Sequence, residues 1–246
     1  MTALSSFDSA MTVAVIGASG GIGSALCERL SEDTQVASLY AFSRKPAESA
    51  GKTIWHPIDI ADESSIEFAI TAVGDIEFDL VIVPTGILHA GAEIQPERRM
   101  SDLNAATLSR VLAVNAIGPA LVAKHFLPRL RRGTKSVFAA LSARVGSISD
   151  NRLGGWASYR ASKAALNQLL RTLSIEHARR WPDSAVVALH PGTVDTGLSK
   201  PFTSRTPEDK LFSPRQAAEY LLRVIDGLTA EDSGGFFAWD GSAIDY

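Results

Sequence analysis

The sequence has one cysteine, Cys27, among its 246 residues, so no intramolecular disulfide can form. It has no excess of either charge, because 24 lysines and arginines stand against 27 aspartates and glutamates, and this balance is unlike the basic surface of a nucleic-acid-binding protein. The start of the chain lacks the basic and apolar regions of a secretory signal, and no apolar run approaches the length of a membrane span. These absences predict a cytoplasmic protein that binds neither nucleic acid nor membrane.

Short apolar or β-branched runs alternate with longer helical patterns along the chain. The near-continuous apolar character of several runs indicates a parallel sheet that is buried on both faces. The expected strands are 12–17, 35–43, 53–58, 80–85, 136–142, 185–190 and 235–239, and the expected helices are 21–32, 62–73, 105–131, 157–180 and 213–228. This order predicts an α/β fold with a Rossmann-type, doubly wound parallel sheet of about seven strands flanked by helices. We expect residues 12–246 to form a single domain after a short N-terminal extension, residues 1–11.

Two stretches without a helix or strand pattern, residues 147–156 and 197–212, follow strand ends. Open α/β sheets bind their ligands at the carboxyl ends of the strands, so we expect both stretches to be substrate loops. The second is also expected to act as a mobile lid.

A glycine-rich turn, Gly17-Ala-Ser-Gly-Gly-Ile-Gly23, follows the first expected strand and opens a helix. Its glycines allow a tight turn and a close approach of the backbone, so that a pyrophosphate can lie at the helix N-terminus. A plain strand-to-helix turn is the alternative, because the spacing is G-x-x-x-G-x-G. The position of the turn in the first strand–helix unit favours dinucleotide binding.

The ends of the next two strands bear on the choice of cofactor. NAD-binding sites usually have an acidic residue at the end of the second strand, whereas this chain has Ser43 and Arg44, which suit the 2′-phosphate of NADP. The sequence therefore predicts NADP and leaves NAD possible. Asp59, after the third strand, can accept from an adenine amino group or cap the next helix, and Asp62 is the better candidate for the cap.

These features occur with four further motifs in an order and spacing that resemble the short-chain dehydrogenase/reductase family. The motifs are Asn115 in VLAVNAIGP, Ser142, Tyr159-Arg-Ala-Ser-Lys163, and HPGTVDT at 190–196. The resemblance extends from residue 12 to the C-terminus. The tail GGFFAWDGSAIDY is also similar to the branch of that family that includes the C-factor signalling protein and the sniffer-type carbonyl reductases.

The resemblance implies a catalytic group of Asn115, Ser142, Tyr159 and Lys163, without a metal. Tyr159 is implied as the general acid/base at the carbonyl oxygen, Ser142 as the hydroxyl that orients the carbonyl, and Asn115 as the anchor of a water. Lys163 shares a helix face with Tyr159 at i+4, and its charge is expected to favour the phenolate of a group whose free pKa is about 10. Cofactor contacts are implied for Gly17, Ser19, Gly20, Gly21, Ile22, Gly23, Ser43, Arg44, Asp59, Ile60, Gly86, Asn115, Tyr159, Lys163, Pro191, Gly192, Val194 and Thr196.

The chain departs from the family pattern in two places. The family's Asn-Asn-Ala-Gly after the fourth strand is replaced by Val83-Pro-Thr-Gly86, so Gly86 is carried over and Thr85 is a weaker candidate. The family's Ser-Ser-x-x-Gly is here Ser142-Ala-Arg-Val-Gly146, which puts alanine at the position of the catalytic serine. Either Ser142 substitutes through a one-residue shift, which would reverse its face of the strand, or the hydroxyl role is weakened.

The resulting prediction is an NADP-dependent oxidoreductase that transfers a hydride between the cofactor and a carbonyl compound or secondary alcohol. The altered motifs favour an alternative, a nucleotide-binding signalling protein of the C-factor type with little or incidental turnover, whereas the intact Asn115, Tyr159 and Lys163 favour the enzyme more. A hydrolase based on His190 is disfavoured because the sequence has no Gly-x-Ser-x-Gly motif. The family resemblance implies further copies of the chain as partners, in a homodimer or homotetramer.

Overall fold

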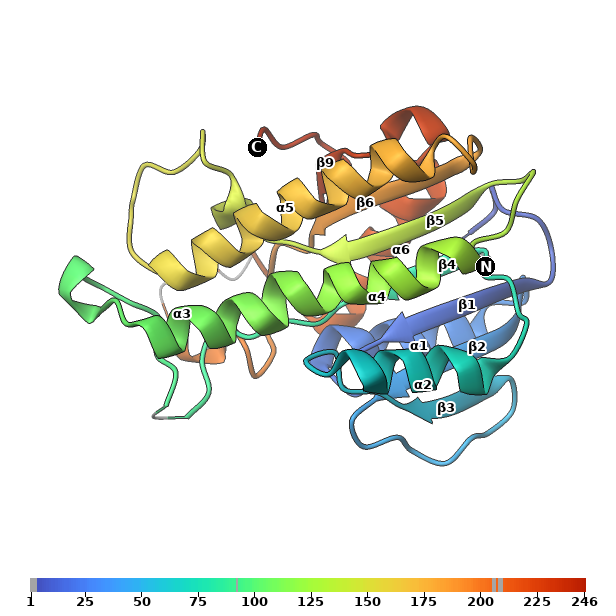
Figure 1. Cartoon of the computed structure of the whole chain (residues 1–246), viewed down its shortest axis with the longest axis horizontal. Helices are drawn as coiled ribbons and strands as arrows, with labels where there is room; N and C mark the ends of the chain where they lie inside the picture. Colours follow the sequence, from blue (N-terminus) through green and yellow to red (C-terminus); the bar gives the residue numbers. More distant parts are fainter. Residues whose placement is uncertain (1–3, 92, 205–206, 208–209) are drawn as a thin grey trace.

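Seven parallel strands form one sheet with helices on both faces (Figure 1). The computed structural model describes residues 4–91, 93–204, 207 and 210–246. The strand order is β3-β2-β1-β4-β5-β6-β9, so the chain returns past β1 to begin the second half of the sheet at β4. The strands of this sheet are β1 (Met11–Ile16), β2 (Val36–Ser43), β3 (Thr53–Pro57), β4 (Leu80–Val83), β5 (Ser136–Leu141), β6 (Ser184–His190) and β9 (Phe236–Ala238).

The helices connect these strands and confirm the expected alternation. They are α1 (Gly21–Glu32), α2 (Glu63–Val73), α3 (Ala105–Leu112), α4 (Gly118–Phe126), α5 (Ala157–His177) and α6 (Pro214–Gly227). The expected helix 105–131 is interrupted by a π turn (Ala113–Ile117) and closes in a 3-10 turn (Leu127–Arg129). A small parallel pair that the sequence did not predict, β7 (Thr193–Val194) and β8 (Leu211–Phe212), lies outside the main sheet.

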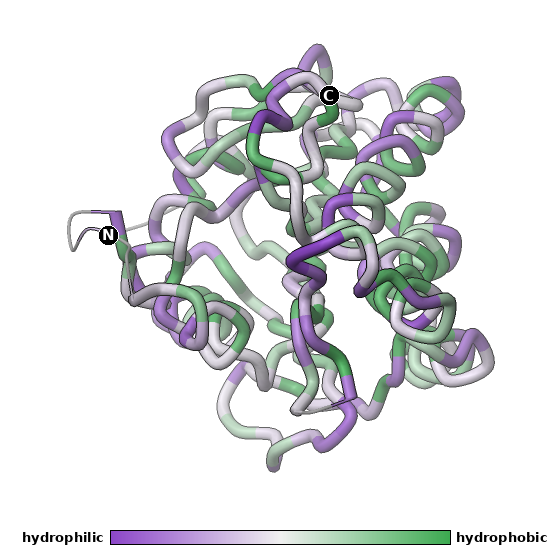
Figure 2. The backbone as a smooth tube through the Cα atoms, turned by 90° about the vertical axis from the view of Figure 1, so that its left-hand side faces the viewer, coloured by the Kyte–Doolittle hydropathy of each residue, from purple (hydrophilic) through white to green (hydrophobic). Residues whose placement is uncertain are grey.

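The two faces of the sheet have separate hydrophobic clusters. On one face, Phe126 of α4 and Leu166 of α5 pack on the strands with α2, and on the other face Leu26 of α1 and Ile225 of α6 do so. Figure 2 views the molecule from the left of Figure 1 and shows apolar and polar residues alternating along the helices, as expected when one face of each helix packs on the sheet. The near-continuous apolar strands therefore supply both layers of the core.

The expectation that no apolar run approaches a membrane span needs correction. The 25-residue run Ala105–Arg129 is long and apolar enough by length and composition. In the fold, however, α3 packs against α5 and α4 packs against α2, while Val122 and Phe126 are fully buried. Part of this apolar run thus packs into the core of an α/β protein.

Side chains at the helix starts explain several helix boundaries. The Asp62 carboxylate accepts from the Ser64 amide and caps α2, which confirms Asp62 as the cap residue. Asn104 caps α3 by accepting from the Thr107 amide, and Ser213 forms a reciprocal capping box with Gln216 at the start of α6. Of the expected lid 197–212, residues 205, 206, 208 and 209 lie outside the described residues, and 200–202 form a short 3-10 turn.

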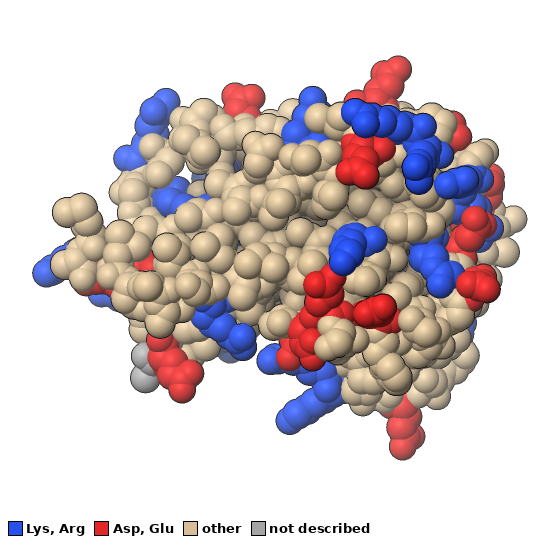
Figure 3. All heavy atoms as spheres, in the orientation of Figure 1, with Lys and Arg blue, Asp and Glu red and all other residues tan. Residues whose placement is uncertain are grey.

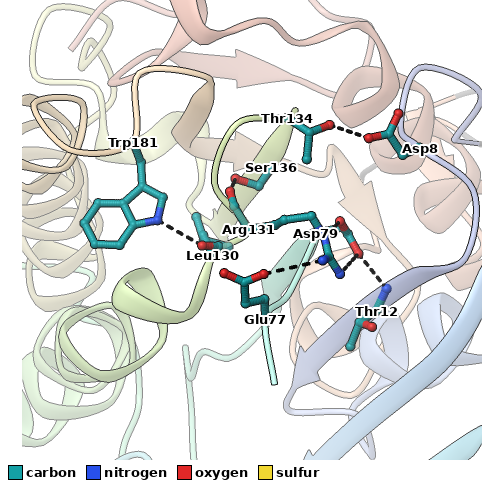
Figure 4. A network of polar contacts seen from close by, with 9 residues as sticks. All are labelled: Asp8, Thr12, Glu77, Asp79, Leu130, Arg131, Thr134, Ser136 and Trp181. Atoms are coloured by element: carbon teal, nitrogen blue, oxygen red, sulfur yellow. Dashed lines mark hydrogen bonds and ion pairs between the residues drawn. The ribbon is translucent and has the colours of Figure 1, made fainter. Parts of the chain in front are cut away.

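A polar network holds the amino-terminal end of the sheet (Figure 4). Asp79, only 4% exposed, accepts from the Thr12 amide at 2.7 Å and from Arg131 Nε at 2.6 Å. The second contact raises the pKa of Arg131. Glu77 lies at the solvent side, 3.4 Å from the Arg131 guanidinium and half exposed. Asp79 therefore ties β1, β4 and the turn before β5 together at the edge opposite to the loops that follow the strands.

Replacing Asp79 with alanine should lower the free energy of unfolding by about 1–3 kcal/mol, because the part-buried Thr12 amide and the Arg131 guanidinium lose their acceptor. Glu77→Ala is the matched control, and the exposed pair that it removes should cost within about 0.5 kcal/mol. Urea unfolding of both variants measures the difference. Equal losses in the two variants would contradict the role given to Asp79.

Candidate active site

The glycine turn between β1 and α1 is tightly enclosed. Gly17 has a φ of +102°, and a Cβ there would lie 2.7 Å from Thr85 Cγ2. A Cβ at Gly21 would lie 2.7 Å from Thr196 Cγ2, so the turn also abuts the segment after β6. Gly20 precedes α1 without a side-chain cap, which leaves the first amides of the helix available to an anion.

A cavity of about 800 Å³ opens beside this turn. It is lined by residues at or just after the carboxyl ends of β1, β2, β3 and β4 and by residues in and around α3. Of the residues predicted to contact the cofactor, those that line it are Gly17, Ser19, Gly20, Ser43, Arg44, Asp59, Ile60 and Gly86. Those that do not line it are Gly21, Ile22, Gly23, Asn115, Tyr159, Lys163, Pro191, Gly192, Val194 and Thr196.

The opposite wall of the cavity was not predicted. Asn104, Thr107 and Arg110 of the α3 region line it, although they carry no motif that the sequence could single out. Only the three-dimensional fold brings them to the same cavity as Arg44, because they follow it by at least sixty positions.

Two buried hydroxyl groups on the cavity wall have no hydrogen-bond partner among the described residues. They are Ser43 Oγ and Thr85 Oγ1, and both residues line the cavity. A buried polar atom without a partner is costly, so these groups are suited to a ligand that brings polar atoms of its own. Together with the uncapped start of α1 and the exposed Arg44, they fit a phosphorylated dinucleotide.

Asn115 lies in the π turn between α3 and α4 and is fully buried. Its Oδ1 accepts from the Ile87 amide at 2.7 Å, while its Nδ2 donates to the Ile87 oxygen at 2.8 Å and to Ser162 Oγ at 3.0 Å. Single π turns within helices often mark functional sites. Asn115 thus joins the loop after β4 to helix α5, and Ser162, which no family motif had marked as a site residue, is part of this link.

Tyr159 and Lys163 occupy one buried face of α5, with exposed fractions of 9% and 3%. Lys163 Nζ donates to the Leu141 oxygen at the end of β5, at 2.7 Å, and lies 5.9 Å from the centre of the Tyr159 ring. A Cβ at Gly86 would lie 3.4 Å from both Lys163 Nζ and Asn115 Oδ1. The structure therefore brings Gly86, Asn115 and Lys163 together next to Tyr159, although they come from three separate segments.

Burial shifts the pKa values of this pair in opposite directions. It raises the pKa of Tyr159 to about 12 and lowers the pKa of Lys163 to about 7, because each group loses the water that would stabilise its charged form. The direction for Tyr159 is opposite to the expected stabilisation of the phenolate by Lys163. At neutral pH the phenol is therefore protonated, and the lysine is close to its own titration.

Ser142 is buried, and its hydroxyl donates to Asn167 Oδ1 at 2.6 Å. Asn167 lies one helical turn after Lys163 on the same face of α5, and the sequence did not single it out. The carbonyl-orienting role of Ser142 stays a prediction, and it requires the hydroxyl to leave Asn167. Ala143, at the position of the family's catalytic serine, has no hydroxyl to offer.

Comparisons with known proteins place the chain among enzymes. A family model for short chain dehydrogenases matches residues 11–207. The chain is similar to 1-hydroxy-2-glutathionyl-2-methyl-3-butene dehydrogenase from Rhodococcus sp. (strain AD45), with 31% identity over 240 residues that cover 96% of this chain and 99% of the relative. It is also similar to C-signal from Myxococcus xanthus, with 37% identity over 145 residues that cover 59% of this chain and 82% of the relative.

Solved structures share the fold over nearly the whole chain. NADPH-bound carbonyl reductase from chicken fatty liver has a TM-score of 0.84 at 25% identity, and the match covers 97% of this chain and 95% of that one. The carbonyl reductase Sniffer of D. melanogaster has a TM-score of 0.80 at 19% identity, with 97% and 100% covered. The second likeness shows the fold alone.

Proposed function

The chain belongs to the short-chain dehydrogenase family, and we propose that it is a carbonyl reductase that uses NADP and also oxidises the corresponding secondary alcohols. The observation that carries this proposal is the meeting of Gly86, Asn115 and Lys163 beside a dinucleotide-sized cavity, with the Tyr159 phenol adjacent. Among the described residues the Tyr159 hydroxyl has no hydrogen-bond partner, so it is available to a substrate oxygen.

NADP is the cofactor, with NAD possible, and the similar chicken carbonyl reductase binds NADPH. We propose that the amides of the glycine turn (Gly17, Ser19, Gly20, Gly21, Ile22 and Gly23) hold the pyrophosphate. Ser43 and Arg44 would hold the 2′-phosphate, and Asp59 and Ile60 the adenine. The segment Pro191, Gly192, Val194 and Thr196 would hold the nicotinamide end with Gly86. When bound, NADP supplies or accepts the hydride.

The chain's own contribution to the reaction is position and protonation. A phenol with a pKa of about 12 is fully protonated at neutral pH, so Tyr159 is ready to donate its proton to the carbonyl oxygen during reduction. Lys163 is held beside it by the Leu141 oxygen, and its proximity favours the phenolate that remains after transfer. Asn115 links the loop that carries Gly86 to α5, because it bonds to Ile87 on one side and to Ser162 on the other. The resting protonation state of Tyr159 is therefore the one that the reduction step starts from.

A second candidate function is a nucleotide-binding signalling protein with incidental turnover. Two observations favour it: the 37% identity to C-signal and the alanine at position 143. Under this alternative the fold and the nucleotide cavity matter for biological output, whereas the Tyr159 hydroxyl does not.

We also propose that the chain is a single cytoplasmic domain that assembles with a second copy through α4 and α5. These helices lie side by side in Figure 1, and the space-filling view shows few charged side chains over the central part of this face, with charged groups towards its right-hand end (Figure 3). Ile117, at the end of the π turn before α4, and Ile175 on α5 are each 52% exposed. Exposed apolar residues with few charges are suited to a subunit interface, and a homodimer or a homotetramer would cover them.

Cofactor preference depends on Arg44. We expect NADPH to bind at least tenfold tighter than NADH, about 1.4 kcal/mol, because a guanidinium pairs with a phosphate through charge-assisted hydrogen bonds. Arg44→Ala should remove most of this gap, and Lys45→Ala, which changes the neighbouring exposed cation, should keep it. Fluorescence titration of the reduced cofactors measures both. NADH binding that equals or exceeds NADPH binding in the unaltered protein would contradict the assignment.

The Tyr159 hydroxyl tests the reaction itself. Tyr159→Phe removes one hydroxyl and little volume, so folding and NADPH affinity should hold while kcat/KM for carbonyl reduction falls by roughly 10²-fold to 10⁴-fold. Tyr40→Phe, which removes a phenol hydroxyl from the core, should leave the rate unchanged. A screen of diverse carbonyl compounds with NADPH identifies the substrate for this assay. Wild-type turnover in Tyr159→Phe would refute the mechanism, and tight NADPH binding without turnover in the whole screen would favour the signalling alternative.

A further inference from the structure

We propose that His89, Phe202 and Trp156 form a recognition site for an aromatic ring carried by the substrate, so that aryl ketones and aryl aldehydes are the preferred carbonyl compounds. This inference rests on the proposed carbonyl reductase function. The three rings and Tyr159 form a continuous series, which we call the ring series. Its centroid separations are 5.7 Å for His89–Phe202, 5.3 Å for Phe202–Trp156 and 6.4 Å for Trp156–Tyr159.

The ring series is not a part of the hydrophobic core. His89, Phe202 and Trp156 are half-buried, and none of them belongs to the clusters on the two faces of the sheet. They come from three different loops, which follow β4, β5 and β7, at the edge of the sheet where ligands bind. Large aromatic side chains that converge on a catalytic group without serving the core are suited to contact a ligand.

The backbone at Trp156 has an unusual left-handed conformation, which sets the direction of the indole ring. Trp156 has φ +52° and ψ +42°, the left-handed region that bulky residues rarely adopt. The two preceding residues, Gly154 and Gly155, also have positive φ values. Non-glycine residues in this region persist where surrounding contacts hold them, and they cluster at functional sites. The turn places Trp156 immediately before the first residue of α5, the helix that carries Tyr159.

Two charged residues, Glu97 and Arg160, hold this turn through hydrogen bonds. The Glu97 backbone oxygen accepts from the Trp156 amide at 2.6 Å, and its buried carboxylate accepts from the Ser158 amide and hydroxyl. Arg160 donates to the oxygens of Gly155 and Gly154 at 3.0 and 3.1 Å. The Glu97 carboxylate and the Arg160 guanidinium are therefore engaged by the protein itself, which leaves the ring of Trp156 as the group that this turn offers to a substrate.

The geometry favours a flat ring over a bulky aliphatic one. The contacts within the ring series are edge-to-face, with interplanar angles of 63° to 77°. Where two of these rings meet, one therefore presents its face and the other its edge. An aromatic ring can stack on one and meet the other, and such pairs stabilise beyond the area they bury. The His89 ring is held in place because its Nε2 lies 2.9 Å from the Gly197 oxygen. His89 also lines the cavity. The ring series therefore borders the cavity at His89 and ends on Tyr159.

The test compares 1-phenylethanol with 1-cyclohexylethanol, which are products of the proposed reduction. Each alcohol is titrated calorimetrically into the protein saturated with NADPH, where no hydride transfer can follow. We expect 1-phenylethanol to bind at least about fivefold tighter, although the cyclohexyl compound is the more hydrophobic of the two. Equal or tighter binding of 1-cyclohexylethanol would overturn the inference, because burial of apolar area alone would then explain the affinity.

Variants at Trp156 identify the source of this preference. Trp156→Asn removes the ring and places there a residue that tolerates the left-handed conformation, so it should fold and bring the two affinities within twofold. Trp156→Phe keeps a ring and should retain a preference for the phenyl compound. Phe68→Leu, which changes an exposed ring on α2, should retain it fully. A full preference in Trp156→Asn would overturn the inference, and Phe202→Leu provides the same test if that variant fails to fold.

Steady-state reduction of acetophenone and cyclohexyl methyl ketone separates this inference from the proposed function. Turnover of both ketones without a binding preference for the phenyl alcohol would support the reductase and overturn the ring site. A binding preference without turnover of either ketone would support the ring site and count against the reductase.

Discussion

Lys163 donates a hydrogen bond from its buried amine to the backbone oxygen of Leu141, and this contact fixes how strand β5 meets helix α5. Charged groups are costly to bury without a partner, so the surroundings of Lys163 are closely fitted. A Cβ at Gly146 would lie 2.8 Å from Lys163 Cβ, and one at Gly86 would lie 3.4 Å from Nζ. The strand end, the turn after it and the loop after β4 are thus all shaped around one side chain.

The burial of Lys163 and Tyr159 also sets the pKa values of both side chains. Burial raises the pKa of Tyr159 to about 12 and lowers that of Lys163 to about 7, so Tyr159 is a neutral phenol at physiological pH, the form from which the proposed proton donation starts. The hydrogen bond between Asn115 and Ser162 connects the π turn before α4 to α5. The bond between Ser142 and Asn167 connects the end of β5 to α5 about one turn further along the helix. In the proposed mechanism, proton delivery by Tyr159 depends on side chains that also hold the structure together.

The sequence predicted the parts of this arrangement that depend on local pattern. Apolar runs located the seven strands, and the spacing of Tyr159 and Lys163 placed both on one helix face. It could not show the contact of Lys163 with Leu141, because a backbone oxygen leaves no sequence signal. The left-handed backbone of Trp156 was also hidden, since that conformation is imposed by distant partners such as Glu97. The expected direction of the Tyr159 pKa was wrong because burial, a property of the tertiary structure, raises that pKa.

The most direct test of this account is the pH dependence of the free energy of unfolding, compared between the unaltered protein and Lys163→Met. Because the pKa of Lys163 is lowered to about 7 in the folded state and is about 10.4 when unfolded, the unfolded chain binds more protons between these values, and stability rises with pH. The stability of the unaltered protein minus that of the variant should increase by up to about 1.4 kcal/mol per pH unit from pH 7.5 to 9.5. A difference that stays flat over this range would mean that Lys163 keeps its ordinary pKa, and it would contradict the buried amine on which the site is built.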